Sequence, residues 1–202
     1  MKITKIETIR IAEFPQLLWV QIHTDEGITG LGETFFNASA VEAYLHDDVA
    51  ARIVGRDPLA IDRIARDLIG YLGFRSTGVE MRAASALDIA LWDLFGKSVG
   101  QPVVQMLGGW TRNRIRTYNT CAGGTYMRKA ETQSTGNWGI ASAPNENAVS
   151  GFNDLNDFLT RADELAESLL SEGITAMKIW PFDQAAEKTH GQYISTEDLR
   201  AS

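Results

Sequence analysis

The chain has 202 residues, 44% of them hydrophobic and 22% charged, which is the composition of an ordinary globular protein. Its net charge of -7 argues against nonspecific binding to nucleic acid or to an anionic membrane, because both need a basic surface. Cys121 is the only cysteine, so no intrachain disulfide can form, and no apolar run approaches the length of a membrane span. The N-terminus also lacks the apolar core of a signal peptide, so we expect a cytoplasmic protein.

The chain opens with three segments of β type. Residues 2–11 are rich in isoleucine among polar partners, which favours a strand. Residues 17–24 and 28–34 flank the turn cluster Asp25-Glu26-Gly27 and therefore indicate a hairpin. Together the three segments predict a small antiparallel meander.

Two helices are expected next. Ser39 and Glu42 have the spacing of a capping box, which predicts a helix of about 15 residues. Asp57-Pro58 has a cap residue followed by proline, the signature of a second helix start, and Gly73 suits its end.

A longer helix is predicted from a second capping box, formed by Thr77 and Glu80, to Gly96. Apolar residues and alanines occupy nearly all of its circumference. A helix of this kind is normally covered on all sides, so we expect it to be central and buried.

A different pattern begins near residue 111. Residues 112–120 resemble a strand, residues 123–153 form a long polar stretch without periodicity, and an amphipathic helix follows and ends at Gly173. A second strand at 174–180 completes a strand–helix–strand order, which predicts a parallel βαβ unit. The polar stretch is expected to act as a lid or as an oligomer contact.

The second of these strands carries the main candidate for chemistry, Lys178. Alternation places Ala176, Lys178 and Trp180 on one face of the strand, with Met177 and Ile179 on the other. An ammonium group is costly to bury unless it meets an anion, and the C-terminal ends of barrel strands are where active sites lie. The alternative is a lysine that extends to solvent at the strand end.

Four segments occur in the order and spacing of a known family: DEGITGLGE at 25–33, GRDPLAIDRI at 55–64, SALDIALWDLFGKSVGQPVVQMLGG at 85–109 and AMKIW at 176–180. The chain resembles the N-terminal part of the enolase superfamily, and most closely its mandelate racemase and muconate lactonising branch. The resemblance implies an α+β capping domain at residues 1–110, followed at 111–202 by the first two βα units of a TIM-type barrel, with the barrel incomplete.

The resemblance also implies Mg²⁺-assisted removal of a proton α to a carboxylate. Lys178 matches the first lysine of the family's Lys-x-Lys strand and would be catalytic, whereas Trp180 takes the place of the second and cannot act as a base. This difference favours a sugar-acid dehydratase over a racemase or cycloisomerase. Phe14 and Phe35 in the capping domain, and Asn119 and Trp180 in the barrel part, are the expected substrate contacts.

The metal ligands of the family lie on later barrel strands, so the resemblance assigns no ligand in this chain. We therefore expect the 202 residues alone to be inactive. The expected partners are a small carboxylate substrate and either further copies of the chain or a complementing C-terminal half. A non-catalytic fragment or interaction module is the alternative from a different functional class.

Overall fold

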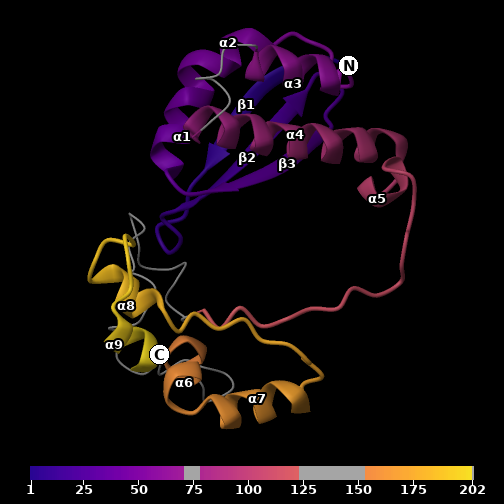
Figure 1. Cartoon of the computed structure of the whole chain (residues 1–202). Coiled ribbons are helices and arrows are strands. Elements are labelled where there is room, and N and C mark those ends of the chain that lie inside the picture. Colours follow the sequence, from indigo (N-terminus) through magenta and orange to yellow (C-terminus); the bar gives the residue numbers. More distant parts are fainter. Residues whose placement is uncertain (71–77, 123–152, 202) are drawn as a thin grey trace. The chain divides into compact units, whose positions relative to one another are not determined.

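The computed structural model describes residues 1–70, 78–122 and 153–201, and Figure 1 shows its course. The chain divides into two compact units, Met1–Asn113 and Arg114–Ser202. None of the helices in the described ranges combines the length and the apolar character that crossing a bilayer requires.

The first unit is built on a three-stranded antiparallel sheet. Its strands are β1 (Ile3–Ile9), β2 (Leu17–Thr24) and β3 (Thr29–Phe35), in the order β1-β2-β3. Alternate residues of β2 are buried, as expected for a sheet with one face toward a core. The predicted meander is confirmed.

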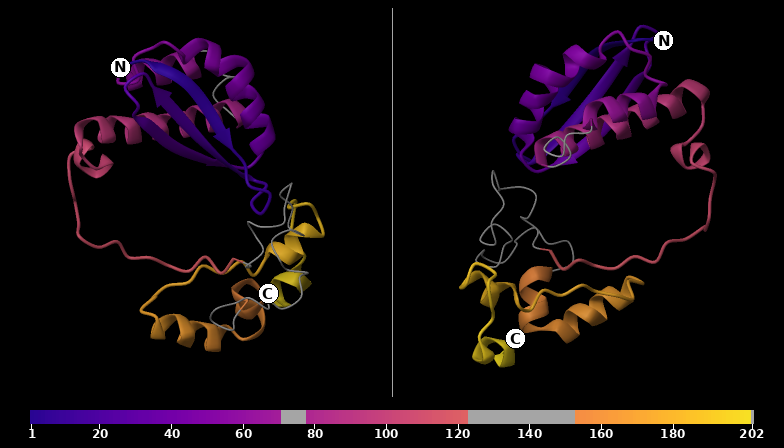
Figure 2. Two further views of the ribbon diagram at one scale, coloured as in Figure 1. Left: turned by 180° about the vertical axis from the view of Figure 1, so that it is seen from behind. Right: turned by 45° about the horizontal axis from the view of Figure 1, so that its top comes forward.

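Helices cover one face of this sheet, as the view from behind in Figure 2 shows. The first predicted helix is a continuous helical stretch made of α1 (Ala38–Tyr44), a π-helical segment η1 (Leu45–Val49) and α2 (Ala50–Ile53). The predicted cap is wrong, because the helix starts one residue before Ser39 and its N-cap Asn37 makes no side-chain capping bond.

The second helix, α3 (Ile61–Ile69), starts later than predicted. The carboxylate of Asp57 accepts a hydrogen bond of 2.9 Å from the backbone N–H of Leu59, which forms a turn ahead of the helix. The helix ends at Gly70, which has φ 65°, and the predicted stop at Gly73 lies outside the described residues.

The longest helix, α4 (Gly78–Val99), runs three residues past its predicted end. Gly100 terminates it with φ 67°, and the short helix α5 (Val103–Met106) follows. Gly96 is buried, and a Cβ there would lie 2.6 Å from the carbonyl oxygen of Gln101. Gly96 therefore permits a close approach of two backbone segments and does not stop the helix.

Two glycines of β3 let the sheet contact α4. A Cβ on Gly30 would lie 2.0 Å from the carbonyl oxygen of Ala90, and one on Gly32 would lie 1.9 Å from that of Ala86. Between them, the backbone N–H of Leu31 donates a 2.8 Å hydrogen bond to Asp93 on α4. The strand and the helix therefore pack backbone against backbone.

The second unit contains two extended segments joined by one parallel bridge, Asn119↔Met177. The predicted strands at 112–120 and 174–180 are thus present only as this bridge. Parallel pairs are less stable per residue than antiparallel ones, and a sheet needs at least about three strands to be stable by itself. The two segments have no third strand among the described residues to extend their pairing.

The helix predicted between these segments is two helices, α6 (Asp154–Thr160) and α7 (Ala162–Ser171), separated by Arg161 in a non-helical conformation. Two short helices follow, α8 (Asp183–Glu187) and α9 (Thr196–Ala201). The core of the unit is small and consists of Cys121, Leu155, Phe158, Leu165 and Leu169.

Candidate functional site

The C-terminal ends of the two extended segments meet at Asn119. Its backbone N–H donates to the carbonyl of Ala176 (3.0 Å), and its carbonyl accepts from the N–H of Lys178 (2.7 Å). Its side-chain amide donates to Asp154 (2.8 Å) and accepts from the N–H of Cys121 (2.7 Å). The backbone of Asn119 thus joins the two segments, its side-chain N–H reaches α6, and its side-chain oxygen holds the turn to Cys121.

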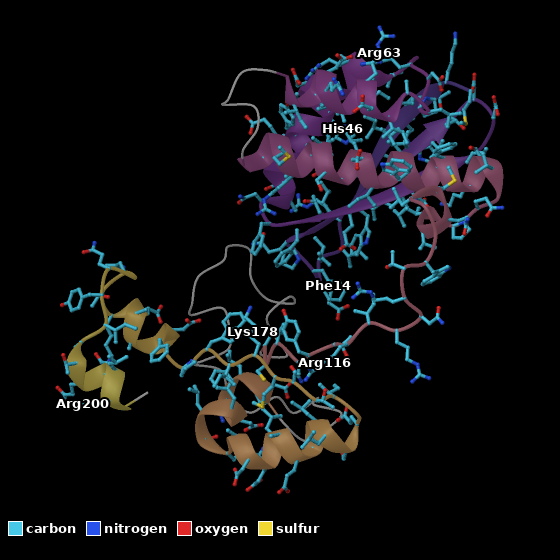
Figure 3. All side chains as sticks on the ribbon, turned by 45° about the vertical axis from the view of Figure 1, so that its right-hand side comes forward. Phe14, His46, Arg63, Arg116, Lys178 and Arg200 are labelled. Carbon is cyan, nitrogen blue, oxygen red and sulfur yellow. The ribbon has the colours of Figure 1, made fainter. Side chains whose placement is uncertain are left out.

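Lys178 lies on the second segment with its side chain exposed to solvent (Figure 3). Its ammonium nitrogen is 4.7 Å from the centroid of the Trp180 ring, a cation–π contact that places the two side chains together as the alternation predicts. Trp180 also packs against the core of the unit. An ammonium group held over an indole ring at a segment end is accessible to an anionic ligand.

One carboxylate lies near this pair. Asp183 starts α8, and burial raises its pKa, while the positive charge of Lys178 acts in the opposite direction. Asp183 is therefore a charge neighbour of Lys178 at the start of a helix.

A cavity of about 410 Å³ opens beside Asn119, and Lys178 and Trp180 are not among its lining residues. Asp154 and Glu172 give it acidic walls, which would repel a carboxylate substrate. The full lining is Asn119, Asp154, Leu165, Ser168, Leu169, Glu172 and Ile174. Among the residues expected to bind substrate in the second unit, only Asn119 borders this cavity, and the charge of the cavity does not suit an acid.

The two capping-domain aromatics lie on separate loops. Phe14 belongs to the loop between β1 and β2 (Figure 3), where its backbone N–H donates to the carbonyl of Ile11 at 2.9 Å. Phe35 ends β3, and its ring centroid is 3.8 Å from that of Phe36. The guanidinium of Arg82 lies 5.0 Å from the centroid of Phe36, and it also donates to the carbonyl of Phe35.

A buried glutamine joins these two loops. Gln16 is 3% exposed; its carbonyl accepts from the N–H of Phe36 (3.0 Å), and its side-chain oxygen accepts from that of Asn37 (3.1 Å). Phe36 and Asn37 have φ 73° and 52°, a left-handed conformation that is costly for side chains other than glycine. Sequence reasoning missed Gln16, whose only signal was its position directly after the Phe14-Pro15 loop.

We expect Gln16→Ala to loosen the turn at Phe36 and Asn37. The substitution removes the acceptor of the part-buried Asn37 N–H, a loss of about 1 kcal/mol. Hydrogen exchange followed by NMR should show faster exchange at the Asn37 amide. Gln21→Ala, on the polar face of β2, is the matched control, and equal effects of the two variants on this amide would contradict the assignment.

Cys121 is fully buried, and burial raises its thiol pKa from 9.0 to about 11. At pH 8 the thiolate fraction should therefore be about a hundredfold lower than in an exposed thiol. We expect reaction with a thiol reagent to be slower by at least this factor in the native chain than in 6 M guanidinium, about the denaturant level that unfolds most domains. Rapid native labelling would show that the thiol is accessible. Cys121 is a packing residue in the core of the second unit.

No group of three or more His, Cys, Asp or Glu side chains in the described ranges is arranged to hold a metal ion. Asp154, Glu172 and Asp183 do not form such a group. The described residues therefore do not fit a magnesium centre.

A three-stranded meander covered by helices, followed by the start of a parallel βα arrangement, defines the capping domain and first barrel units of an enolase-type fold. Residues 6–108, about half of the chain, match the family model described as mandelate racemase / muconate lactonizing enzyme, N-terminal domain. The chain belongs to this family. The superfamily and fold predicted from the sequence are confirmed.

Solved structures and curated proteins extend the comparison. An enolase of the mandelate racemase subgroup from Agrobacterium tumefaciens is 55% identical, with a TM-score of 0.76, over 100% of this chain and 44% of that chain. The D-galactonate dehydratase of Xanthomonas euvesicatoria pv. vesicatoria is 40% identical over 125 residues, which are 61% of this chain and 32% of that protein. The chain thus spans about a third of the length of the curated relatives that it matches.

A third relative is described with its ligands. An enolase from Pantoea ananatis with bound D-gluconate and magnesium is 37% identical over 59% of this chain and 30% of its own, with a TM-score of 0.54. Of these three relatives, one is named for D-galactonate and one contains D-gluconate, which are both sugar acids.

Proposed function

We propose that this chain is the N-terminal part of a sugar-acid dehydratase, with a capping domain at 1–110 and the first two βα units of the barrel at 111–202. The observation that carries the proposal is the 40% identity to a D-galactonate dehydratase over 61% of the chain. The substrate class is a small carboxylate with hydroxyl groups on the α and β carbons. The reaction removes the α proton and the β hydroxyl and releases water.

Lys178 is the residue of this chain that we assign to the reaction. Its ammonium group would bind the substrate carboxylate and stabilise the negative charge that develops when the α proton leaves. Trp180 holds that ammonium over its ring at 4.7 Å and offers a flat surface to the sugar chain, but it cannot take a proton. The base that removes the α proton is therefore not Trp180, which favours a dehydratase over a racemase with two bases on this strand.

In the capping domain we assign substrate contact to the loops of Phe14 and Phe35. The turn that follows Phe35 is held by Gln16, and Arg82 of α4 lies against Phe36, so an aromatic ring and a cation lie together. Both features suit a polyhydroxylated anion, because the ring covers C–H groups and the guanidinium binds oxygen.

Magnesium, when bound in the completed protein, would supply a Lewis acid for the substrate carboxylate. The described residues do not form its site, so we expect turnover to need polypeptide beyond the part that this chain shares with its relatives. The complete relatives contain such polypeptide, since the chain covers 44% of the Agrobacterium tumefaciens enolase.

The test compares two proteins: the 202-residue chain, and a chimera in which this chain replaces the matching part of the Agrobacterium tumefaciens enolase. D-galactonate and D-gluconate are supplied with Mg²⁺, and the keto-deoxy acid product is measured. We expect product from the chimera alone. Exchange of the α proton without loss of water would indicate a racemase, and product from the 202-residue chain alone would refute the need for completion.

A further inference from the structure

The backbone pairing of the two extended segments depends on Asn119 in the part of the chain that the structure describes. The parallel bridge Asn119↔Met177 is made by two backbone hydrogen bonds. The N–H of Asn119 donates to the carbonyl of Ala176 (3.0 Å), and the N–H of Lys178 donates to the carbonyl of Asn119 (2.7 Å). A parallel pair is weak unless neighbouring strands extend it. The place of Lys178 beside the first segment therefore depends on how firmly Asn119 is held.

A carboxylate on α6 holds the side chain of Asn119. The amide N–H of Asn119 donates to Oδ2 of Asp154 at 2.8 Å, in a part-buried contact between residues 35 positions apart. The amide oxygen accepts from the backbone N–H of Cys121, two residues on, at 2.7 Å. A hydrogen bond to a carboxylate is stronger than one between neutral groups. Asp154 therefore restrains the amide more than the local turn does.

The first turn of α6, which carries Asp154, is itself firmly held. Asp154 is the first residue of this helix, and the side chain of Leu155 beside it is 2% exposed in the core of the unit. The backbone N–H of Asn153 donates to the carboxylate of Asp157, which is 3% exposed and pairs with Nε of Arg161 at 3.0 Å. The helix start is thus braced from two sides, so the Asp154 carboxylate has a fixed position.

Another contact between the two segments lies in solvent and closer to their N-terminal ends. Arg116 donates through Nε to the hydroxyl of Thr175 and through Nη2 to its carbonyl, both at 3.2 Å. Both hydrogen bonds are exposed, and water competes for exposed donors and acceptors. This contact should therefore restrain the position of Lys178 less than the part-buried contact of Asn119 does.

We propose that Asp154 is a positioning residue for Lys178, because it fixes the side chain of Asn119, to which the backbone of Lys178 is hydrogen-bonded. The proposal rests on the proposed function, in which the ammonium group of Lys178 binds the substrate carboxylate. Asn119 then acts by position as well, and this role replaces the direct substrate contact expected from the sequence. A displacement of a binding group by about 1 Å can lower the rate about 10²-fold, so a contact away from the ammonium group affects turnover.

The first test needs no activity and measures hydrogen exchange of the Lys178 amide by NMR in the 202-residue chain. We expect exchange about tenfold faster in Asp154→Ala, because the acceptor of this amide is then less restrained. Asp154→Ser, whose hydroxyl suits a helix start but is too short to reach Asn119, should have the same effect and serves if the alanine variant fails to fold.

Two control variants accompany this test. Asp154→Asn keeps a side-chain oxygen for the Asn119 amide and removes only the charge, so exchange should stay within about twofold of the native chain. Asp163→Ala removes an exposed carboxylate from the first turn of α7 and should also leave the Lys178 amide unchanged.

The second test is a double-mutant cycle in the chimera described above. We expect Asp154→Ala to lower kcat/KM for the sugar acid by about 10–100-fold, and Asp154→Asn to retain most of the activity. When Lys178 is already alanine, Asp154→Ala should lower the remaining kcat/KM by less than about twofold, because the group that it positions is absent. A carboxylate that only stabilises the fold would lower both backgrounds equally.

Unchanged exchange at the Lys178 amide in both Asp154→Ala and Asp154→Ser would overturn the proposal. Equal effects of Asp154→Ala on kcat/KM with and without Lys178 would overturn it as well. Faster exchange in the 202-residue chain, together with a chimera that forms no keto-deoxy acid, would support the positioning of Lys178 while refuting the proposed function. The two proposals can therefore fail separately.

Discussion

Gly32→Ala is expected to unfold the first unit or to displace β3 from α4. The added Cβ would lie 1.9 Å from the carbonyl oxygen of Ala86 and 3.0 Å from the backbone nitrogen of Ala90. Both neighbours are helix backbone, which cannot turn aside as a flexible side chain can. Overpacking of this kind costs about 3 kcal/mol or more, a large part of the total stability of a small domain.

Chemical denaturation followed by circular dichroism measures this effect. Leu31→Ala is the matched control, because Leu31 lies between the two glycines with its side chain 44% exposed on the opposite face. We expect its loss to stay below about 1 kcal/mol, since it removes a few exposed carbon atoms. A Gly32→Ala protein as stable as the control would show that β3 and α4 are not in backbone contact in solution.

Lys178→Ala is expected to remove most of the dehydration activity of the chimera. Loss of a fixed charge that stabilises a developing anion lowers turnover by about 10²–10³-fold. The fold should be unaffected, because the side chain is exposed and its contact with Trp180 is worth about 0.5–1 kcal/mol. The measurement is kcat/KM for the sugar acid, together with the melting temperature of the same sample.

Lys188→Ala is the control for general charge effects, since Lys188 is an exposed lysine of the same unit that pairs with Asp198. Surface pairs of this kind contribute little, and we expect its activity to be unchanged. Lys178→Arg keeps the charge with a different shape and should retain more activity than the alanine variant. If Lys178→Ala turned over substrate normally, the alternative of a lysine that only extends to solvent would be correct.

Local sequence patterns predicted the strands of the first unit and its long helix well. The meander follows from alternation and one turn cluster, and α4 follows from its length and helical spacing. Helix-cap signatures were less reliable. The N-cap of α1 is Asn37 and not Ser39, and Asp57 forms a turn ahead of α3 instead of capping it. Cap signatures are short, and backbone geometry imposed by packing overrides them.

The sequence patterns predicted only part of the candidate site. Alternation correctly brought Lys178 and Trp180 together, because neighbours two apart share a face of any extended segment. It did not indicate that Asn119 uses both ends of its amide in structural hydrogen bonds, or that Gln16 joins the two capping-domain loops. The stretch at 123–153, expected to act as a lid or as an oligomer contact, lies outside the described residues apart from Asn153.

The order of residues by itself determined the antiparallel sheet, the helical periods and the family, because these depend on neighbours within a few positions or on motifs in a fixed order. Tertiary structure alone decided why Gly30 and Gly32 must be glycine, which acid of α4 pairs with Lys97 and which side of α4 packs on the sheet. Asp88 and Asp93 occupy the same helix five residues apart, yet within residues 1–70, 78–122 and 153–201 only Asp93 meets a cation and a strand N–H. Such outcomes depend on which distant segment lies within a few ångströms, and that distance is set by packing and not by sequence separation.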